Sequence, residues 1–326
     1  MVENDLFEAI RREDVVIFAG AGFSGYAGYP LGSSLGKELF DALLPGEQTE
    51  ELKALPLDYL AEQIVRIRHG SRDLINQVLD DVFGAPPTSN KDHELLASIP
   101  HFKTIITTNY DRLFENAYGE AATLIFREQD VTKWKEGGVN IIKIHGDLSD
   151  KASVILTRND YSRFYRTDYS SPFWASITKD IATKTILFLG YGYEDPNVWA
   201  IFERVYEHIG DKRKAAYFIG PNVDAVKVSY LEAKGIEYMN RTGGDFLSAL
   251  MKHIEDHIFS DIEQRWVSSE TFWKFTRSRN LEVPLRDSTS GLRVVSINGM
   301  DGQQMNGHIK FTINPESDFP ERHKAF

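Results

Sequence analysis

The chain of 326 residues contains no cysteine. This absence excludes disulfide bonds, zinc sites with thiolate ligands and a cysteine nucleophile. It suits a reducing compartment, and we expect the protein to be cytoplasmic. The N-terminus lacks the apolar core of a signal peptide, and no apolar run approaches the ~20 residues that a membrane helix needs. We therefore expect no association with a membrane.

Positive charge is also scarce. The 37 lysine and arginine residues stand against 48 aspartate and glutamate residues, which gives a formal net charge of -11 at pH 7. An acidic surface repels nucleic acid, so we expect no direct binding to DNA or RNA. The net charge does not exclude binding to a basic partner, or to a partner subunit that itself binds nucleic acid.

Apolar strands alternate with amphipathic helices along most of the chain. Buried strands are predicted at residues 14–20, 102–109, 140–147, 185–192, 214–220 and 235–240, with a possible one at 153–157. Helical periodicity is found at residues 35–44, 58–69, 73–83, 110–119, 161–184, 195–210 and 245–259. This alternation predicts an α/β fold: a doubly wound, mostly parallel, Rossmann-like sheet with helices on both faces.

Two segments depart from this alternation. Helical patterns crowd together at about residues 35–98, which predicts a helical insert in a domain of residues 1–265. In residues 266–326, "LRVVSI", a turn at Asn298-Gly299 and "HIKFTI" predict a pair of strands. We expect this C-terminal extension to be a docking element or the start of a further domain.

The first strand runs into a glycine-rich turn, Gly20-x-Gly22-x-x-Gly25. One interpretation is a phosphate cradle, in which glycine lets the backbone N–H groups of residues 20–24 approach a pyrophosphate at a helix N-terminus. The other is a tight strand-to-helix turn that needs small residues. An ordinary dinucleotide domain also has an acidic residue at a second strand end, roughly 20 residues on. Residues 35–44 predict a helix there, which argues against a hydride-transfer domain.

Polar side chains follow the later strands. Asn109 and Asp111 come after the second strand, and His145 comes after the third. Ligands of parallel sheets bind at the carboxyl ends of strands. These residue types fit cleavage of the bond between nicotinamide and ribose, which passes through an oxocarbenium-like sugar. Asn109 could bind ribose hydroxyls or water, Asp111 could oppose the developing positive charge, and His145 could act as a base.

Each of these residues also has a structural interpretation. Asp111 could cap the following helix, Asn109 could complete a turn, and His145 could be a core residue. Asp195, before a proline, fits a helix N-cap. His253 and His257 lie on one face of a predicted helix, but Ile254 breaks the zincin pattern and we expect no metal. The aromatic residues between 164 and 174 could stack on a nucleotide, although core packing explains most of them better.

In combination these motifs resemble the sirtuin superfamily over about residues 10–260. "GAGFS" is similar to its nucleotide loop, and "IHGD" to its catalytic His-Gly pair. "TTNYD" resembles an element that has glutamine at the position of Thr108, and "LGYGYEDP" resembles a segment near the adenosine ribose. The resemblance implies catalytic roles for Asn109, Asp111 and His145. It also implies that NAD is bound as the substrate by a set of residues from two loops: Gly20, Ala21, Gly22, Phe23, Ser24, Gly190, Tyr191 and Asp195.

The chain differs from protein-deacylating sirtuins. It lacks their four-cysteine zinc module, and Leu31-Gly32-Ser33 follows "GYP" where they have an aspartate-phenylalanine-arginine run. "VILTRNDYSRFY" is similar to bacterial sirtuin-like effector domains. That branch implies an NAD hydrolase that depletes NAD in anti-phage defence. It also implies a homo-oligomer or an assembly with a sensor subunit, such as a short Argonaute or a translocase ATPase. A protein deacylase and a non-catalytic sensor of NAD or ADP-ribose derivatives remain as alternatives.

Overall fold

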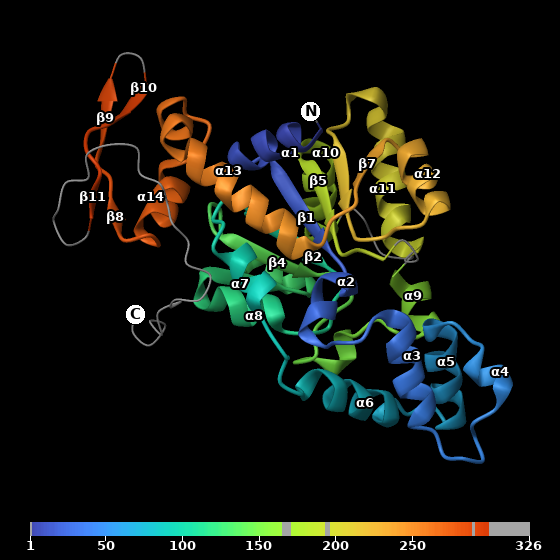
Figure 1. Ribbon diagram of the computed structural model, residues 1–326. Coiled ribbons are helices and arrows are strands. Elements are labelled where there is room, and N and C mark those ends of the chain that lie inside the picture. The colour runs from blue at the N-terminus through green and yellow to red at the C-terminus, as the bar shows by residue number, and fades with distance from the viewer. Residues whose placement is uncertain (1, 165–170, 193–195, 289–290, 300–326) are drawn as a thin grey trace. The chain divides into compact units, whose positions relative to one another are not determined.

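The computed structural model describes residues 2–164, 171–192, 196–288 and 291–299 (Figure 1). The chain forms two compact units, Met1–Leu250 and Met251–Phe326. A catalytic domain that ends at residue 265 remains a proposal.

The first unit is built on a seven-stranded sheet in which the strand order is β3-β4-β2-β1-β5-β6-β7. Each pair of neighbouring strands runs parallel (Figure 1). The strands are β1 (Val15–Ala19), β2 (Thr104–Thr107), β3 (Ala122–Ile125), β4 (Val139–Lys143), β5 (Thr185–Leu189), β6 (Ala216–Ile219) and β7 (Ile236–Met239). The predicted α/β, Rossmann-like sheet is confirmed.

The central strands are buried on both faces, as the continuous apolar sequence of β1 requires. Alternate residues such as Phe18 and Phe188 point to one face, where they pack against Trp174 and Phe202. The helices on that face are α10 (Pro172–Thr183), α11 (Pro196–Ile209) and α12 (Ala225–Ala233). Helices α1 (Val2–Arg11), α7 (Lys91–Ala97) and α8 (Leu113–Tyr118) lie on the other face, so the sheet is doubly wound (Figure 1).

The helical insert has a core of its own and is shorter than the expected residues 35–98, because α7 lies on the sheet. It comprises α3 (Gly32–Asp41), α4 (Glu50–Lys53), α5 (Leu57–Ile67) and α6 (Asp73–Gly84). Leucines and isoleucines at helical spacing, such as Leu39 and Ile64, are buried between these helices. The same cluster includes Tyr110, Val154 and Leu156, so the insert packs directly on the loops that follow β2 and β4.

Short helical segments complete the first unit. They are α2 (Ala21–Ser24), η1 (Gly25–Ala27), η2 (Gly119–Ala121), η3 (Glu128–Lys133), η4 (Lys151–Ser153), α9 (Arg158–Phe164) and η5 (Gly210–Lys212). The possible strand at 153–157 is wrong. Val154 and Leu156 do alternate with a more exposed Ile155, but their side chains enter the core of the insert and not a sheet.

Helix α13 (Gly243–Glu263) begins in the first unit and continues into the second, which also contains α14 (Ser269–Arg277). Four short strands follow: β8 (Leu281–Glu282), β9 (Leu285–Ser288), β10 (Gly291–Val294) and β11 (Asn298–Gly299). The predicted turn at Asn298-Gly299 is wrong, because these residues form β11 and pair antiparallel with β8. Residues 292–294 belong to a pair, but their partner is β9; "HIKFTI" lies outside the described residues.

Within the described ranges, none of the helices has the length and hydropathy of a membrane span.

Candidate functional site

The four sequence motifs follow β4, β2, β1 and β5, which are neighbours in the sheet. The chain adds β2 to one side of β1 and β5 to the other, so the strand order reverses between β1 and β5. Parallel sheets bind ligands in the crevice at such a switch point. Asn109 and His145 each follow by two residues the paired positions Thr107 and Lys143. The structure therefore brings the predicted residues to one edge of the sheet.

Two N–H groups of the glycine loop are already used in backbone hydrogen bonds. The N–H of Gly20 donates to the Leu189 carbonyl at 3.2 Å, and the N–H of Phe23 donates to the Gly20 carbonyl at 2.9 Å. Helix α2 begins at Ala21, so the N–H groups of Ala21 and Gly22 lie in a first turn, where a helix supplies no backbone acceptor. These two N–H groups therefore have no acceptor within α2 and are candidates to bind a phosphate.

The tight-turn interpretation of this loop also has support. A Cβ added at Gly22 would lie 2.6 Å from the Gly190 carbonyl oxygen, so the loop and the end of β5 touch through their backbones. The Phe23 side chain is buried and packs on the rings of His93 and Phe114, at centroid distances of 4.6 and 6.0 Å. Phe23 therefore anchors the loop in the core.

Asn109 lies beside this loop and is 4% exposed. Its Nδ2 donates to the Gly20 carbonyl at 3.1 Å and to Ser24 Oγ at 3.0 Å. A carbonyl can only accept, so the amide nitrogen must face the loop. The Asn109 Oδ1 atom is buried and has no hydrogen-bond partner in the described part of the chain. Such an atom is expected to receive a donor from a ligand or a water molecule.

Asp111 has a structural role that the sequence had left open. Its Oδ1 accepts from the N–H of Leu113 at 3.0 Å and so supports the start of α8. Burial raises the pKa of this carboxyl group, and hydrogen bonds from Leu113 and Ser24 together with the charge of Lys143 oppose that rise. The carboxyl group is thus connected to the glycine loop through Ser24.

His145 is buried in a turn that requires glycine at the next position. Gly146 has φ +81°, and a Cβ there would lie 2.1 Å from the Ser153 carbonyl oxygen. The His145 carbonyl accepts from the N–H of Ile155 at 3.0 Å, and its ring meets the Tyr161 ring edge-on at 5.4 Å. Tyr161 belongs to α9, within the motif that resembles the bacterial effector domains.

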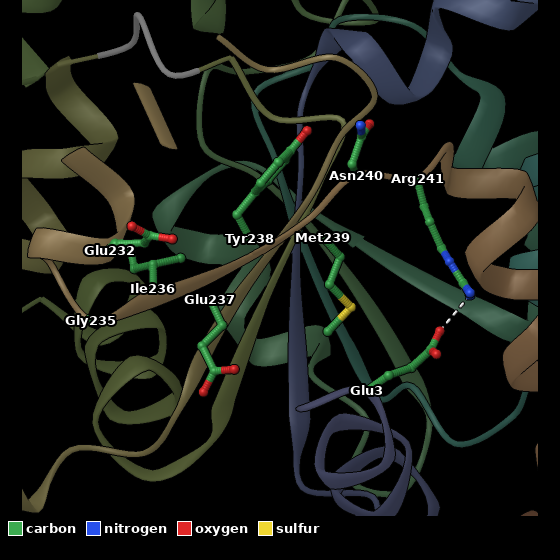
Figure 2. Close-up of a pocket in the computed structure, with 9 residues that line it drawn as sticks. All are labelled: Glu3, Glu232, Gly235, Ile236, Glu237, Tyr238, Met239, Asn240 and Arg241. Carbon is green, nitrogen blue, oxygen red and sulfur yellow. Dashed lines mark hydrogen bonds and ion pairs between the residues drawn. The ribbon is translucent and has the colours of Figure 1, made fainter. Parts of the chain in front are cut away.

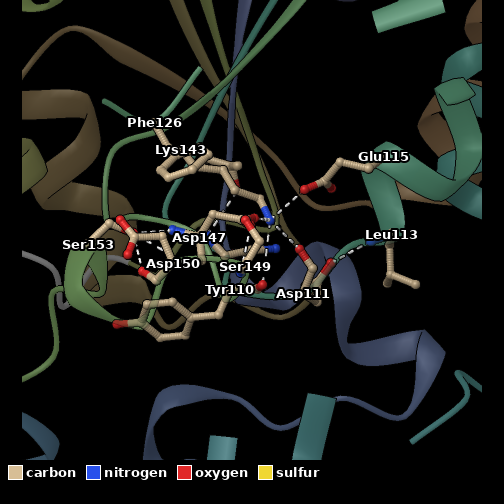
Figure 3. Close-up of polar contacts among 12 residues, drawn as sticks. Tyr110, Asp111, Leu113, Glu115, Phe126, Lys143, Asp147, Ser149, Asp150 and Ser153 are labelled. Carbon is tan, nitrogen blue, oxygen red and sulfur yellow. Dashed lines mark hydrogen bonds and ion pairs between the residues drawn. The ribbon is translucent and has the colours of Figure 1, made fainter. Parts of the chain in front are cut away.

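Lys143, which the sequence analysis did not single out, lies between these loops (Figure 3). Its side chain is fully buried, and its Nζ contacts the Asp111 carbonyl at 2.6 Å, Asp147 Oδ2 at 2.6 Å and Glu115 Oε1 at 2.7 Å. A charge of this kind is buried only when it is paired. The sequence signal for Lys143 was a charged side chain within "NIIKIHGD", a segment that predicts a buried strand.

Two of the remaining predicted residues are also described. Gly190 directly follows β5, and Tyr191 is buried with its ring near those of Phe188 and Trp199, at centroid distances of 5.7 and 6.4 Å. Asp195 lies outside the described residues. Of the aromatic residues between 164 and 174, Phe173 and Trp174 are in the hydrophobic core.

A surface groove runs along the edge strand β7, away from the motif-bearing strands (Figure 2). Its lining includes Glu3, Glu232 and Glu237, and Arg241 there is paired with Glu3. An anionic dinucleotide would be repelled by these carboxylates. The groove contains none of the predicted site residues.

The described residues include no group of three or more histidine, aspartate or glutamate side chains placed to hold a metal ion. His253 and His257 interact with each other through a hydrogen bond of 2.8 Å from the ring of His257 to the carbonyl of His253.

Comparison with known proteins agrees with the motifs. Residues 103–239 match the family model of the SIR2-like domain. The chain is 33% identical over 219 residues to the NAD(+) hydrolase ThsA of Enterococcus faecium, covering 65% of this chain and 44% of that protein. It is 27% identical over 262 residues to the Defense-associated sirtuin 2 of Bacillus subtilis, and this match covers 74% of this chain and 25% of that protein. A solved Sir2 homologue in complex with NAD is 16% identical, with a TM-score of 0.46 over 78% of this chain and 94% of that one. The chain spans less than half the length of these two curated relatives.

Proposed function

Because residues 103–239 match the family model of the SIR2-like domain, we propose that the chain hydrolyses NAD, with release of nicotinamide and ADP-ribose. The observation that carries this proposal is the environment of Asn109. Its buried Oδ1 needs a donor, and its Nδ2 is held by the same glycine loop that offers the N–H groups of Ala21 and Gly22. One loop would thus bind the pyrophosphate and orient the amide that meets the ribose.

The chemistry needs little from the protein beyond placement and charge. Nicotinamide leaves NAD as a neutral molecule, so no general acid is required. Asn109 Oδ1 would accept from a ribose hydroxyl or from the attacking water, and Asp111, when ionised, would oppose the positive charge that develops on the sugar. His145 would take the proton of the water as its oxygen bonds to the anomeric carbon. The net reaction consumes one water and releases one proton.

The absence of cysteine favours hydrolysis over protein deacylation, since the deacylating sirtuins that the motifs resemble have a four-cysteine zinc module. Relatives named NAD(+) hydrolase and defense-associated sirtuin support the same choice. We propose that the protein acts in the cytoplasm as the effector of an anti-phage defence system. A homo-oligomer or a sensor subunit would restrain the effector until infection.

The test is product analysis after incubation of the purified chain with NAD, alone and with the proteins encoded beside it. We expect equal amounts of nicotinamide and ADP-ribose, without any need for an acylated peptide. Asn109→Ala and His145→Ala should each reduce turnover by roughly 100-fold or more, as removal of one transition-state contact does.

Two results would replace the proposal. Nicotinamide release only in the presence of an acyl-lysine peptide would indicate a deacylase. Tight binding of NAD or ADP-ribose without turnover in any of these mixtures would indicate a sensor. Arg66→Ala, an exposed change in the insert, serves as the control and should leave turnover unchanged.

A further inference from the structure

Lys143 connects two loops that approach the site from different strands. It is the last residue of β4, and its ammonium group donates to the carbonyl oxygens of Asp111, at 2.6 Å, and Tyr110, at 3.4 Å (Figure 3). Both carbonyls belong to the loop after β2, within two residues of Asn109. The same ammonium contacts Asp147 Oδ2 at 2.6 Å, in the loop that carries His145.

Hydrogen bonds of Asp147 and Ser153 also stabilise the loop after β4, which carries His145. Asp147 Oδ1 accepts from the N–H of Ser149 at 2.9 Å, and the Ser153 hydroxyl accepts from the N–H of Asp147 at 3.0 Å. Because Ser153 also crowds Gly146, the turn after His145 has little freedom to move.

Lys143 is one of the contacts between this turn and the Asn109 loop; two others run from the Tyr110 hydroxyl to the Ile155 carbonyl, at 2.5 Å, and from the N–H of Ile144 to the Thr107 carbonyl, at 3.0 Å. Of these contacts, only Lys143 makes the connection through a buried charge.

The charges around Lys143 make this connection strong. The ammonium pairs with Glu115 of α8 as well as with Asp147, and all three side chains are buried or nearly so. Burial would raise the pKa of Asp147, but Lys143 and the Ser149 contacts hold it below its usual value. Removing the ammonium would leave two carboxylates without their cation in a region of low dielectric.

We propose that Lys143 is a positioning residue: it sets the distance and orientation between Asn109 and His145 by tying their loops to one buried cation. This inference rests on the proposed NAD hydrolysis. Lys143 would not touch the substrate, and its effect would be on the geometry in which the amide and the imidazole face one anomeric carbon. Small misplacements of such groups cost on the order of 100-fold in rate.

The experiment compares two variants of the full chain with a matched control. Lys143→Met keeps the aliphatic stem and removes the ammonium. The triple variant Lys143→Met/Glu115→Gln/Asp147→Asn also neutralises the two carboxylates that lose their cation. It therefore allows the test to be made if the single variant fails to fold. Arg279→Met is the control, because it removes a buried cation paired with Glu255 at 3.2 Å in the second unit.

Two readouts are needed, namely the kinetics of NAD turnover and hydrogen exchange of residues 108–116 and 144–154. We expect kcat to fall by on the order of 100-fold in both Lys143 variants with KM changed by less than about 3-fold, and exchange to accelerate in both segments together. Arg279→Met should keep kcat. A folded Lys143 variant with wild-type kcat, or with exchange unchanged in either segment, would overturn the inference.

Failure of the proposed function gives a different pattern. If the wild-type chain does not turn over NAD, hydrolysis is refuted, and the exchange data alone then decide on Lys143. Acceleration of both segments would support a connection between the loops, and acceleration of one segment or neither would refute it.

Discussion

Gly190 lies directly against the backbone of Phe23: a Cβ built on Gly190 would be 2.1 Å from the Phe23 nitrogen and 2.6 Å from the carbonyl carbon of Gly22. Gly190 also has φ +58°, in the left-handed region that side chains disfavour. The end of β5 and the glycine loop after β1 therefore meet at the switch point of the sheet with their backbones in direct contact.

The first prediction concerns this contact. Gly190→Ala should lower the free energy of unfolding by about 1–3 kcal/mol, because the methyl group must displace the loop and the backbone is strained. The rate of NAD turnover should also fall, and by more than the loss of folded protein accounts for, since the displaced loop holds Asn109. Urea unfolding and steady-state kinetics measure the two effects. Gly46→Ala, which has open space around its Cα and no left-handed φ, is the matched control and should change neither. Wild-type stability in Gly190→Ala would show that the loop moves at little cost.

The second prediction concerns Ser24, whose hydroxyl helps to hold the pKa of Asp111 down against the effect of burial. If Asp111 must be ionised to stabilise the sugar cation, turnover falls as the pH drops through its pKa. Ser24→Ala removes one hydrogen bond to the carboxylate, so the acid limb of kcat/KM should move to higher pH. The measurement is the pH profile between about pH 4 and 8.

Ser98→Ala is the control for this profile, because its hydroxyl bonds to the Leu95 carbonyl away from the site. The acid limb of its kcat/KM profile should lie at the same pH as in the wild type. An unmoved limb in Ser24→Ala would assign the acid limb to a group other than Asp111.

The third prediction concerns the connection of the insert to the loop after β4. Arg72 contacts Asp160 Oδ1 and Oδ2 at 2.9 and 2.7 Å through Nη1, and it donates to the Val154 carbonyl at 3.0 Å through Nη2. Arg72→Met should reduce the free energy of unfolding by about 2 kcal/mol, because these charge-assisted bonds are mostly shielded from water.

An exposed ion pair in the same insert supplies the comparison. Arg66 is 66% exposed and lies 3.5 Å from Glu62, so Arg66→Met should change stability by less than about 0.5 kcal/mol. A double-mutant cycle of Arg72→Met with Asp160→Asn should show a coupling energy of at least about 1 kcal/mol. Additive effects would mean that Arg72 acts only through the Val154 carbonyl.

The parallel sheet could be predicted because its central strands are short apolar runs that end in glycine or polar residues. Strand β3 was missed, since it is an edge strand in which alternate residues are only partly buried. Residues 153–157 show the opposite error: Val154 and Leu156 alternate like a strand, but the core they join is that of the insert. The alternation of apolar and polar residues shows which side chains are buried, but it does not show which element they pack against.

The candidate site was partly predictable for a similar reason. Polar residues at strand ends meet at one edge of a parallel sheet, which places Asn109, Asp111 and His145 from the sequence alone. The role of Lys143 was not predictable, because its partners on the loop after β2 lie 32 and 33 positions away in the chain. Nor does a glycine pattern reveal that the N–H of Phe23 is used within its own turn.

The last prediction concerns His93, which is fully buried under the glycine loop between the rings of Phe23 and Phe114. The Tyr26 hydroxyl accepts from the N–H groups of Asp92 and His93 and therefore donates its own hydrogen to His93 Nδ1, at 2.9 Å. The imidazole is thus neutral, and burial lowers its pKa from 6.5 to about 3.

Between pH 6.5 and 3 the unfolded chain binds a proton at His93 that the folded chain does not, so stability must fall as the pH falls through this window. At pH 5 the loss from this residue should be about 2 kcal/mol relative to pH 8. His93→Asn keeps an acceptor for Tyr26 and cannot be protonated. Urea unfolding at both pH values should therefore show a smaller loss in the variant than in the wild type, by about that amount. Equal losses in the two proteins would mean that His93 is protonated in the folded state at pH 5, and that the glycine loop above it tolerates a buried charge.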